Sequence, residues 1–205
     1  MKRAENPGFR WYLGALLSGL VLVAIWLVVS NAGRENAALP ELGAVPSFSL
    51  TTEAGSNADD AMFNGKISVV DFIFTSCAGI CPMMSGRMAW LQEELRDHPD
   101  IQFVSFSVDP LTDTPDVLTE YGKRYGAIPG RWTFLTGDRD QIYTLTKNGF
   151  RLGLEAEGEN AIIHSPKFVL VDRKGSIRGY YDSDSTDTMD QLKEHAVLLA
   201  ERKTP

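Results

Sequence analysis

The sequence has few of the residues that cross-linked or nucleic-acid-binding proteins depend on. Its 205 residues include two cysteines and three histidines, and the formal net charge at pH 7 is −7. A small chain held together by disulfides would carry several cysteine pairs, so this fold does not rely on them. An acidic chain without a basic stripe also lacks the electrostatic surface that binds nucleic acid. No internal repeat or low-complexity tract is present.

Charge is absent from one long stretch near the start of the chain. Residues 11–30, WYLGALLSGLVLVAIWLVVS, contain no charged side chain. As a helix rising about 1.5 Å per residue, this run would cover roughly 30 Å, the hydrocarbon thickness of a bilayer. Lys2, Arg3 and Arg10 precede it, and basic residues stay on the cytoplasmic side. We therefore predict a transmembrane anchor over residues 11–30, a cytoplasmic segment over residues 1–10, and an exported remainder.

A cleaved signal peptide is the alternative interpretation of the same stretch. Its apolar region is usually only about 7–15 residues long and ends at a site with small residues. The run in this chain is longer, and Ser30-Asn31-Ala32 matches such a site poorly. The pattern favours an uncleaved anchor in the inner membrane, with the carboxyl-terminal part on the periplasmic side.

The remainder divides into a short tether and one domain. Residues 31–46 are small and polar with two prolines, which predicts a linker. Residues 47–205 are long enough for one domain with a single core. The part of the chain after residue 30 is more acidic than the whole chain. Residues 1–30 carry three basic residues and one acidic residue, which leaves −9 for residues 31–205.

Strand and helix patterns alternate along the domain, and the last two strands form a hairpin. This order predicts an α/β fold with a mixed sheet, parallel in its middle and flanked by helices. The run ISVVDFIF is continuous and rich in β-branched residues, as in a strand buried on both faces. Beyond a short strand in FSLTTEAGS, the predicted strands are 67–74, 101–109, 131–138 and the hairpin 167–182, and the predicted helices are 82–98, 114–125, 138–147 and 186–202.

Both cysteines lie in one short loop after the predicted buried strand. Cys77 and Cys81 belong to the segment DFIFTSCAGICPMM, residues 71–84. A disulfide between them would close a loop of about five residues and stabilise the fold by only about 2 kcal/mol, whereas a loop of about 100 residues would give more than 4. A purely structural disulfide is therefore disfavoured.

A redox pair and a metal site both remain compatible with this loop. Cys81 immediately precedes Pro82, which is a favourable residue in the first turn of a helix. Backbone N–H groups and the helix dipole there favour a thiolate, so we expect the pair to be prone to form thiolates. Cα atoms one helical turn apart are about 6 Å from each other, which permits a disulfide. The same spacing allows two thiolates to hold one metal ion.

His164 is the residue that favours a metal site. It follows Ile162-Ile163 and precedes the strand KFVLVD, on a loop that could face the cysteine loop. His98 and His195 lie in polar helical surroundings and have no such position. Two thiolates and one imidazole make a soft site that suits copper. Structural zinc would need a fourth ligand, for which the sequence has no obvious candidate.

The exported domain resembles the Sco/SenC family of membrane-anchored copper proteins, which have a thioredoxin-like fold. The resemblance covers about residues 42–200 and rests on three segments in the family's order: FTSCAGICP, SVDPLTDTP and HSPKFVLVDRKGSIRGYYD. It implies that Cys77, Cys81 and His164 bind copper, as Cu(I) or Cu(II). Asp109, in SVDP, corresponds to an acidic position near the family's site, whereas Asp113 is predicted only to help start a helix.

The same resemblance implies a role in assembly of the copper centre of cytochrome c oxidase. The protein would deliver copper to the copper-bearing subunit, or to another copper-handling protein, or keep that centre's cysteines reduced. The alternatives are a thiol–disulfide oxidoreductase that uses Cys77 and Cys81 as its catalytic pair and, with weaker support from Thr75, a thiol peroxidase. A copper chaperone is favoured over an enzyme.

The sequence departs from the family pattern at two positions. Ala78-Gly79 stands where many members have a proline after the first cysteine, which predicts a more flexible loop. Pro166 precedes a strand, at a place where thioredoxin-like folds often have a cis-proline. We hypothesise on that ground that the Ser165–Pro166 bond is cis.

Overall fold

The computed structural model describes residues 19–24, 39–152 and 165–202. The chain forms two compact units, residues 1–39 and residues 40–205. In the first unit, residues 19–24 are helical. No helix among the residues that the structure describes is long and apolar enough to cross a membrane. Most of the predicted anchor lies outside these residues, so the anchor stays a prediction.

The described part of the second unit contains one eight-stranded mixed sheet with strand order β1-β8-β7-β4-β5-β6-β2-β3. The three central strands β4, β5 and β6 are parallel, whereas β7 pairs antiparallel with β4. The strands are β1 Gly43–Ala44, β2 Ser49–Thr52, β3 Asn57–Asp59, β4 Ile67–Ile73, β5 Ile101–Ser107, β6 Trp132–Thr136, β7 Lys167–Val171 and β8 Ser176–Asp182.

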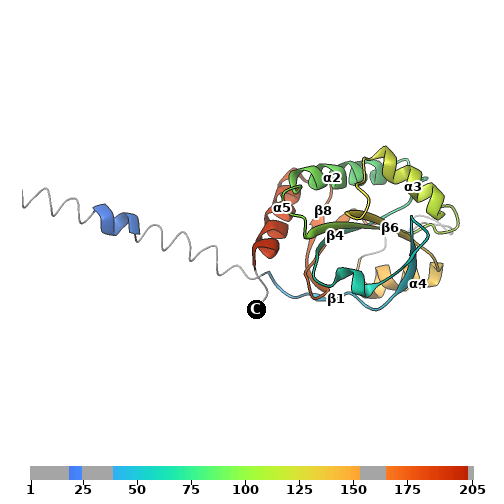
Figure 1. Ribbon diagram of the computed structural model, residues 1–205, viewed down its shortest axis with the longest axis horizontal. Helices are drawn as coiled ribbons and strands as arrows, with labels where there is room; N and C mark the ends of the chain where they lie inside the picture. The colour runs from blue at the N-terminus through green and yellow to red at the C-terminus, as the bar shows by residue number, and fades with distance from the viewer. Residues whose placement is uncertain (1–18, 25–38, 153–164, 203–205) are drawn as a thin grey trace, which may run out of the picture. The chain divides into compact units, whose positions relative to one another are not determined.

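Helices cover both faces of this sheet (Figure 1). One face carries α2, α3 and α5, and the other carries α4 and a 3-10 turn. Side chains cap several helices; Thr114, for example, accepts a hydrogen bond from the backbone N–H of Val117 at the start of α3. The helical segments are the 3-10 turn η1 Asp60–Phe63, α2 Ile80–Glu94, α3 Pro115–Arg124, α4 Arg139–Thr144, the π-helical turn η2 Leu145–Gly149 and α5 Thr186–Glu201.

The long elements agree with the sequence predictions, including the parallel arrangement in the middle of the sheet. Two short strands, β1 and β3, and the turn η1 were not predicted. The compact unit also begins before the predicted boundary at residue 47. The cause is the short strand β1, which the residues on either side of it tie to β8. The backbone N–H of Leu42 donates to the carbonyl of Ile177 in β8, and that of Val45 donates to the carbonyl of Gly175 in the turn before β8.

Aromatic side chains fill the core on the α4 face of the sheet. The Phe72 ring stacks on Phe106 at 5.0 Å between ring centroids and meets the edge of Phe150 at 5.1 Å. All three side chains are fully buried. Burying each such ring stabilises the fold by roughly 2–3 kcal/mol. Because Phe72 lies on β4, this cluster fixes the strand that leads to the cysteines.

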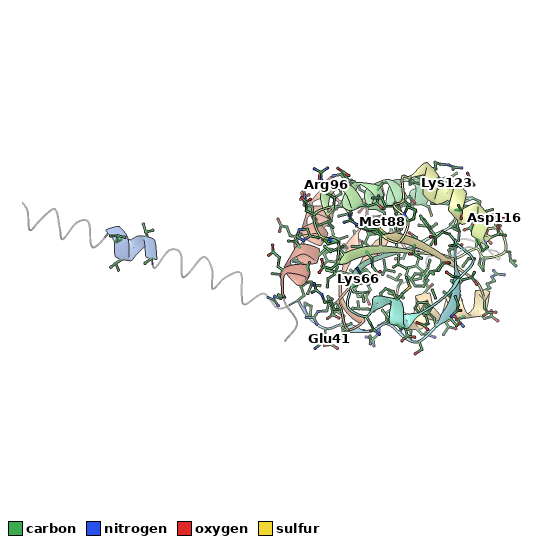
Figure 2. The ribbon with its side chains drawn as sticks, viewed as in Figure 1. Glu41, Lys66, Met88, Arg96, Asp116 and Lys123 are labelled. Atoms are coloured by element: carbon green, nitrogen blue, oxygen red, sulfur yellow. The ribbon has the colours of Figure 1, made fainter. Side chains whose placement is uncertain are left out.

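The opposite face of the sheet is packed against α2, α3 and α5. Met84, Met88 and Leu91 of α2 are fully buried, and their spacing places them on one side of the helix. Figure 2 shows Met88 between α2 and the sheet. Met84 therefore belongs to the core. The helix that begins at the cysteine loop is thus held along its length.

Replacing Phe72 by alanine should destabilise the second unit by about 3–5 kcal/mol, since the ring leaves a cavity between two other rings. Leu111→Ala is the control, because the Leu111 side chain is 80% exposed, and its effect should stay within about 0.5 kcal/mol. Urea unfolding followed by circular dichroism measures both. Equal losses in the two variants would contradict this account of the core.

Candidate functional site

The candidate site lies where β4 ends and α2 begins. All seven residues of β4 are buried, and the chain leaves the sheet at Ile73 into the segment that contains Cys77. We predicted that α2 begins at Pro82, but it begins at Ile80, with Gly79 as its N-cap. Gly79 has no side chain to accept hydrogen bonds from the first turn. The backbone N–H groups at this helix end therefore need another acceptor.

The Cys77 sulfur is that acceptor. The thiol is half-buried, and burial alone raises its pKa. Hydrogen bonds to the sulfur outweigh this effect of burial and lower the pKa of Cys77 below its ordinary value. The donors are the backbone N–H and the thiol of Cys81 and the backbone N–H groups of Gly79 and Ile80. Hydrogen bonds from a helix N-terminus stabilise a thiolate in this way. Cys77 is thus the activated and accessible thiol.

Cys81 differs from the sequence prediction. It is fully buried on the inner side of α2. Burial raises the pKa of its thiol well above the ordinary value, and the nearby Cys77 and Asp71 raise it further. The expected tendency to form a thiolate therefore does not extend to Cys81, because its position in the first turn directs the side chain into the core. The two cysteines are neighbours with opposite environments.

A buried carboxylate connects the cysteine loop to the next strand. Asp113 is fully buried and accepts a hydrogen bond from the backbone N–H of Thr75 at 3.1 Å. It also accepts hydrogen bonds from the hydroxyls of Thr75 at 2.5 Å and Ser107 at 2.6 Å. The sequence predicted Asp113 only as a residue near a helix start. Nothing in its immediate pattern signals these contacts, because both partners lie on other elements.

The engagement of Thr75 weakens the thiol peroxidase hypothesis. A threonine near a peroxidatic cysteine would have to donate its hydroxyl proton towards the reacting sulfur or the peroxide. The single hydroxyl proton of Thr75 is instead donated to Asp113. The support that Thr75 gave to this hypothesis is therefore lost.

Asp109 lies on the turn that follows β5, beside the same edge of the sheet. Its backbone N–H donates to the Ser107 hydroxyl at 3.1 Å, and its carbonyl accepts from the backbone N–H groups of Thr112 and Asp113. The Asp109 side chain is half-exposed. Its backbone groups, and not its carboxylate, form the turn, so the carboxylate remains available for another role.

A second buried carboxyl group, Asp71, lies in the middle of β4. It is fully buried, and neither oxygen makes a hydrogen bond of normal geometry with a described residue. Burial raises its pKa from 3.8 to about 7, and the Ser105 hydroxyl on the paired strand offsets part of that rise. Asp71 was not among the residues predicted to have a role. The signal was present, however, as one acidic residue inside a continuous apolar run.

The third predicted copper ligand, His164, lies outside the described residues. Among residues 19–24, 39–152 and 165–202, no three histidine, cysteine, aspartate or glutamate side chains are grouped so that they could hold a metal ion. Ser165, the next residue after His164, is buried. The hypothesis of a cis Ser165–Pro166 bond is wrong, because no peptide bond of the described chain is cis. Trans is the preferred state even before proline.

The fold and the paired cysteines define a thioredoxin-like dithiol protein. The model of the SCO1/SenC family matches residues 37–198, most of the chain. The SCO1 protein homolog of Bacillus subtilis is 30% identical over 180 residues, which cover 86% of this chain and 93% of that protein. The chain therefore belongs to the SCO1/SenC family, and the resemblance inferred from the three motifs is confirmed.

Solved structures agree with this assignment. The structure of BsSco, a member of the Sco family of cytochrome c oxidase assembly proteins with a disulfide switch, is similar with a TM-score of 0.70 and 28% identity. The alignment covers 80% of this chain and 98% of BsSco. The structure of yeast Sco1 with copper bound has a TM-score of 0.61 and 25% identity, and covers 80% of this chain and 96% of that one. Members of this family thus bind copper.

Asp71 should make the stability of the protein depend on pH. The folded state keeps this proton up to about pH 7, whereas the ordinary pKa is 3.8. Stability is then complete below about pH 4, falls as pH rises to about 7, and is flat above it. Between pH 5 and pH 8 the free energy of unfolding should fall by roughly 3 kcal/mol. Asp71→Asn has no proton to lose and should remove this loss, measured by urea unfolding at both pH values.

Asp116→Asn is the control for the Asp71 experiment. Asp116 is exposed in the first turn of α3, so the same chemical change there should leave the pH dependence intact. Parallel pH profiles for Asp71→Asn and the unmodified protein would show that Asp71 does not hold its proton in the folded state.

Proposed function

We propose that this protein binds one copper ion through Cys77, Cys81 and His164 and carries it as cargo in the assembly of cytochrome c oxidase. The observation that carries the proposal is the pair of sulfur atoms at the start of α2, where the Cys81 thiol is a hydrogen-bond partner of Cys77. Thiolate sulfur is the ligand type that selects Cu(I), and imidazole suits copper as well. The donor set therefore fits the ion that yeast Sco1 binds.

The path of the chain into β7 supports His164 as the third ligand. β7 runs antiparallel to β4, with Val169 opposite Val70. The beginning of β7 at Lys167 is therefore near the carboxyl end of β4, where the cysteine loop starts. His164 precedes Lys167 by three residues in the sequence. Its imidazole would complete a three-coordinate site, and the half-exposed Asp109 is a candidate for an outer contact.

The proposal includes the place of action. The uncharged run 11–30 would anchor the chain in the inner membrane, and the basic residues before it would stay in the cytoplasm. The second unit would then act on the periplasmic side. There the partner would be the copper-bearing subunit of the oxidase or another copper-handling protein.

A thiol–disulfide oxidoreductase is the second candidate, and the unequal environments of the two thiols favour it. Cys77 is half-exposed with a lowered pKa, which suits attack on a partner's disulfide. Cys81 is buried behind it and is suited to resolve the mixed disulfide. In the first step the Cys77 sulfur would bond to one cysteine of the partner's disulfide, and the other partner cysteine would leave as a thiolate. In the second step Cys81 would attack Cys77, form the Cys77–Cys81 disulfide and release the first partner cysteine as a thiolate. The protein would end with a disulfide and the partner with two thiols.

Copper loading of the purified full-length protein tests the first candidate. The reduced protein should bind one Cu(I) per chain, and the Cys77–Cys81 disulfide form should bind none at this site, because copper requires the thiolates. His164→Ala should weaken binding about 10-fold or more through loss of one ligand. His98→Ala is the matched control and should bind as the unmodified protein does. Equal loading of reduced, oxidised and His164→Ala samples would overturn the proposed site.

Trapping of mixed disulfides tests the second candidate. With a substrate peptide that contains one disulfide, Cys81→Ser should accumulate a covalent complex through Cys77, because nothing resolves it. Cys77→Ser should form no more than a trace, since Cys81 is buried and its pKa is raised. Non-reducing electrophoresis and mass spectrometry measure both products. Complexes of equal yield from the two variants would contradict the division of roles.

A further inference from the structure

Three apolar side chains are exposed at the end of the sheet that carries the cysteine loop. Leu111 is 80% exposed, Val117 is 38% exposed and Met83 is 37% exposed. Leu111 lies in the turn after β5, Val117 lies in the first turn of α3, and Met83 lies near the start of α2. We call these three residues the apolar patch.

Hydrogen bonds join the three segments that carry the patch. The buried Asp113 carboxylate accepts from the backbone N–H of Thr75 at 3.1 Å, which joins the turn after β5 to the cysteine loop. The hydroxyls of Ser85 in α2 and Tyr121 in α3 are hydrogen-bonded at 2.7 Å, and both helices cover the same face of the sheet (Figure 1). β4 and β5 are parallel neighbours, so the segments that follow them lie at one edge. The apolar patch therefore lies at the edge of the sheet that also carries Cys77.

The fold does not need an apolar residue at the tip of the turn after β5. The turn is closed by its backbone, because the N–H groups of Thr112 and Asp113 donate to the carbonyl of Asp109. Leu111 lies at the tip of this turn, a place that polar residues usually occupy. A single exposed leucine is ordinary on a protein surface, but apolar side chains gathered beside a reactive pair indicate an interaction site.

The charges beside the apolar patch have one sign. Residues 74–86, which include the cysteine loop and the start of α2, contain no charged side chain. Residues 108–119 contain three aspartates and no lysine or arginine. Asp113 is buried, whereas Asp109 is half-exposed and Asp116 is exposed at the start of α3 (Figure 2). The patch thus combines exposed apolar side chains with negative charge at its border.

This combination selects one kind of occupant. A second copy of the chain would bring Asp109 and Asp116 close to the same negative residues, and like charges facing each other disfavour association. A protein segment with apolar side chains would bury Leu111 from water. Lysine or arginine residues on that segment would be complementary to the two exposed aspartates.

We propose that the apolar patch docks a segment of a protein partner that carries apolar side chains and lysine or arginine residues beside its own sulfur ligands. Docking there holds the partner's sulfur atoms at the edge where Cys77 is partly exposed. The inference rests on the proposed function, because copper transfer and disulfide reduction both need a partner at this edge. It adds the surface and the chemistry that recognise the partner.

Fluorescence anisotropy with the purified full-length protein tests the surface without using the thiols. The probe is a labelled peptide rich in leucine and lysine, with serine in place of cysteine. At about 20 mM NaCl it should bind about 10-fold more tightly than a matched peptide in which serines replace the leucines, and than one in which glutamates replace the lysines. Raising NaCl to about 200 mM should reduce the preference for lysine over glutamate.

Substitutions in the patch should weaken binding of the leucine–lysine peptide. Leu111→Ser should weaken it about 10-fold, because this change removes the most exposed apolar side chain of the patch. Val117→Ser should weaken it by less. Asp116→Lys should weaken it at low salt and leave the preference for leucine over serine in place. Since these side chains are exposed, circular dichroism should show that all three variants are folded.

Two exposed residues away from the patch provide matched controls. Asp97→Lys makes the same charge change as Asp116→Lys, but beyond the other end of α2. Ile128→Ser removes an apolar side chain that is 47% exposed in the loop between α3 and β6. Both variants should bind the leucine–lysine peptide as the unmodified protein does.

Equal affinity of the unmodified protein for the three peptides would overturn the proposal, and so would equal affinity of Leu111→Ser and the unmodified protein for the leucine–lysine peptide. Analytical ultracentrifugation tests the other occupant. A dimer that Leu111→Ser dissociates would mean that a second copy covers the patch, which would also overturn the proposal.

Copper loading of the same samples separates this proposal from the proposed function. Leu111→Ser should bind copper as the unmodified protein does, since Leu111 is not a ligand. Copper binding without any preference among the peptides would overturn the docking surface alone. The expected peptide preference in a protein that binds no copper would support the docking surface and overturn the copper site.

Discussion

The contact between the Cys77 sulfur and the first N–H groups of α2 is the interaction on which the site depends. It needs a strand that ends at a fixed place and a helix that begins at a fixed place. Aromatic packing under Phe72 fixes the strand, and the buried stripe that contains Met88 fixes the helix. Because Gly79 provides no side-chain cap, the sulfur satisfies the helix end, and the helix end in turn stabilises the thiolate.

Two buried carboxyl groups near this contact have different surroundings. Asp113 is surrounded by donors from Thr75 and Ser107, and these contacts compensate for burial. Asp71 lacks such donors, and its pKa is accordingly raised to about 7. Its charge would oppose a thiolate at Cys81, whose thiol pKa it raises. The electrostatics therefore keep negative charge on the outer sulfur, where a partner or a soft cation can reach it.

The sequence predicted the parts of this arrangement that depend on local pattern. The continuous apolar run of β4 and the alternation of strands and helices are local signals. β1 was missed because a two-residue strand is defined only by its partner, β8. The expectation of a thiolate-prone pair did not hold for Cys81, since proximity to the helix start does not say which sulfur faces the N–H groups. The contacts of Asp113 were missed because they depend on how the ends of two strands meet: Thr75 lies 38 residues away, and Ser107 ends β5.

The family assignment and the geometry together favour copper as the cargo. The two thiols differ in burial and in pKa, and this difference also suits the pair to the reduction of a partner's disulfide. The most direct measurement is X-ray absorption at the copper edge of the Cu(I)-loaded full-length protein. The account predicts two sulfur neighbours and one imidazole nitrogen around each copper, with the nitrogen lost in His164→Ala. A copper coordinated by nitrogen and oxygen alone, or by a single sulfur, would contradict it.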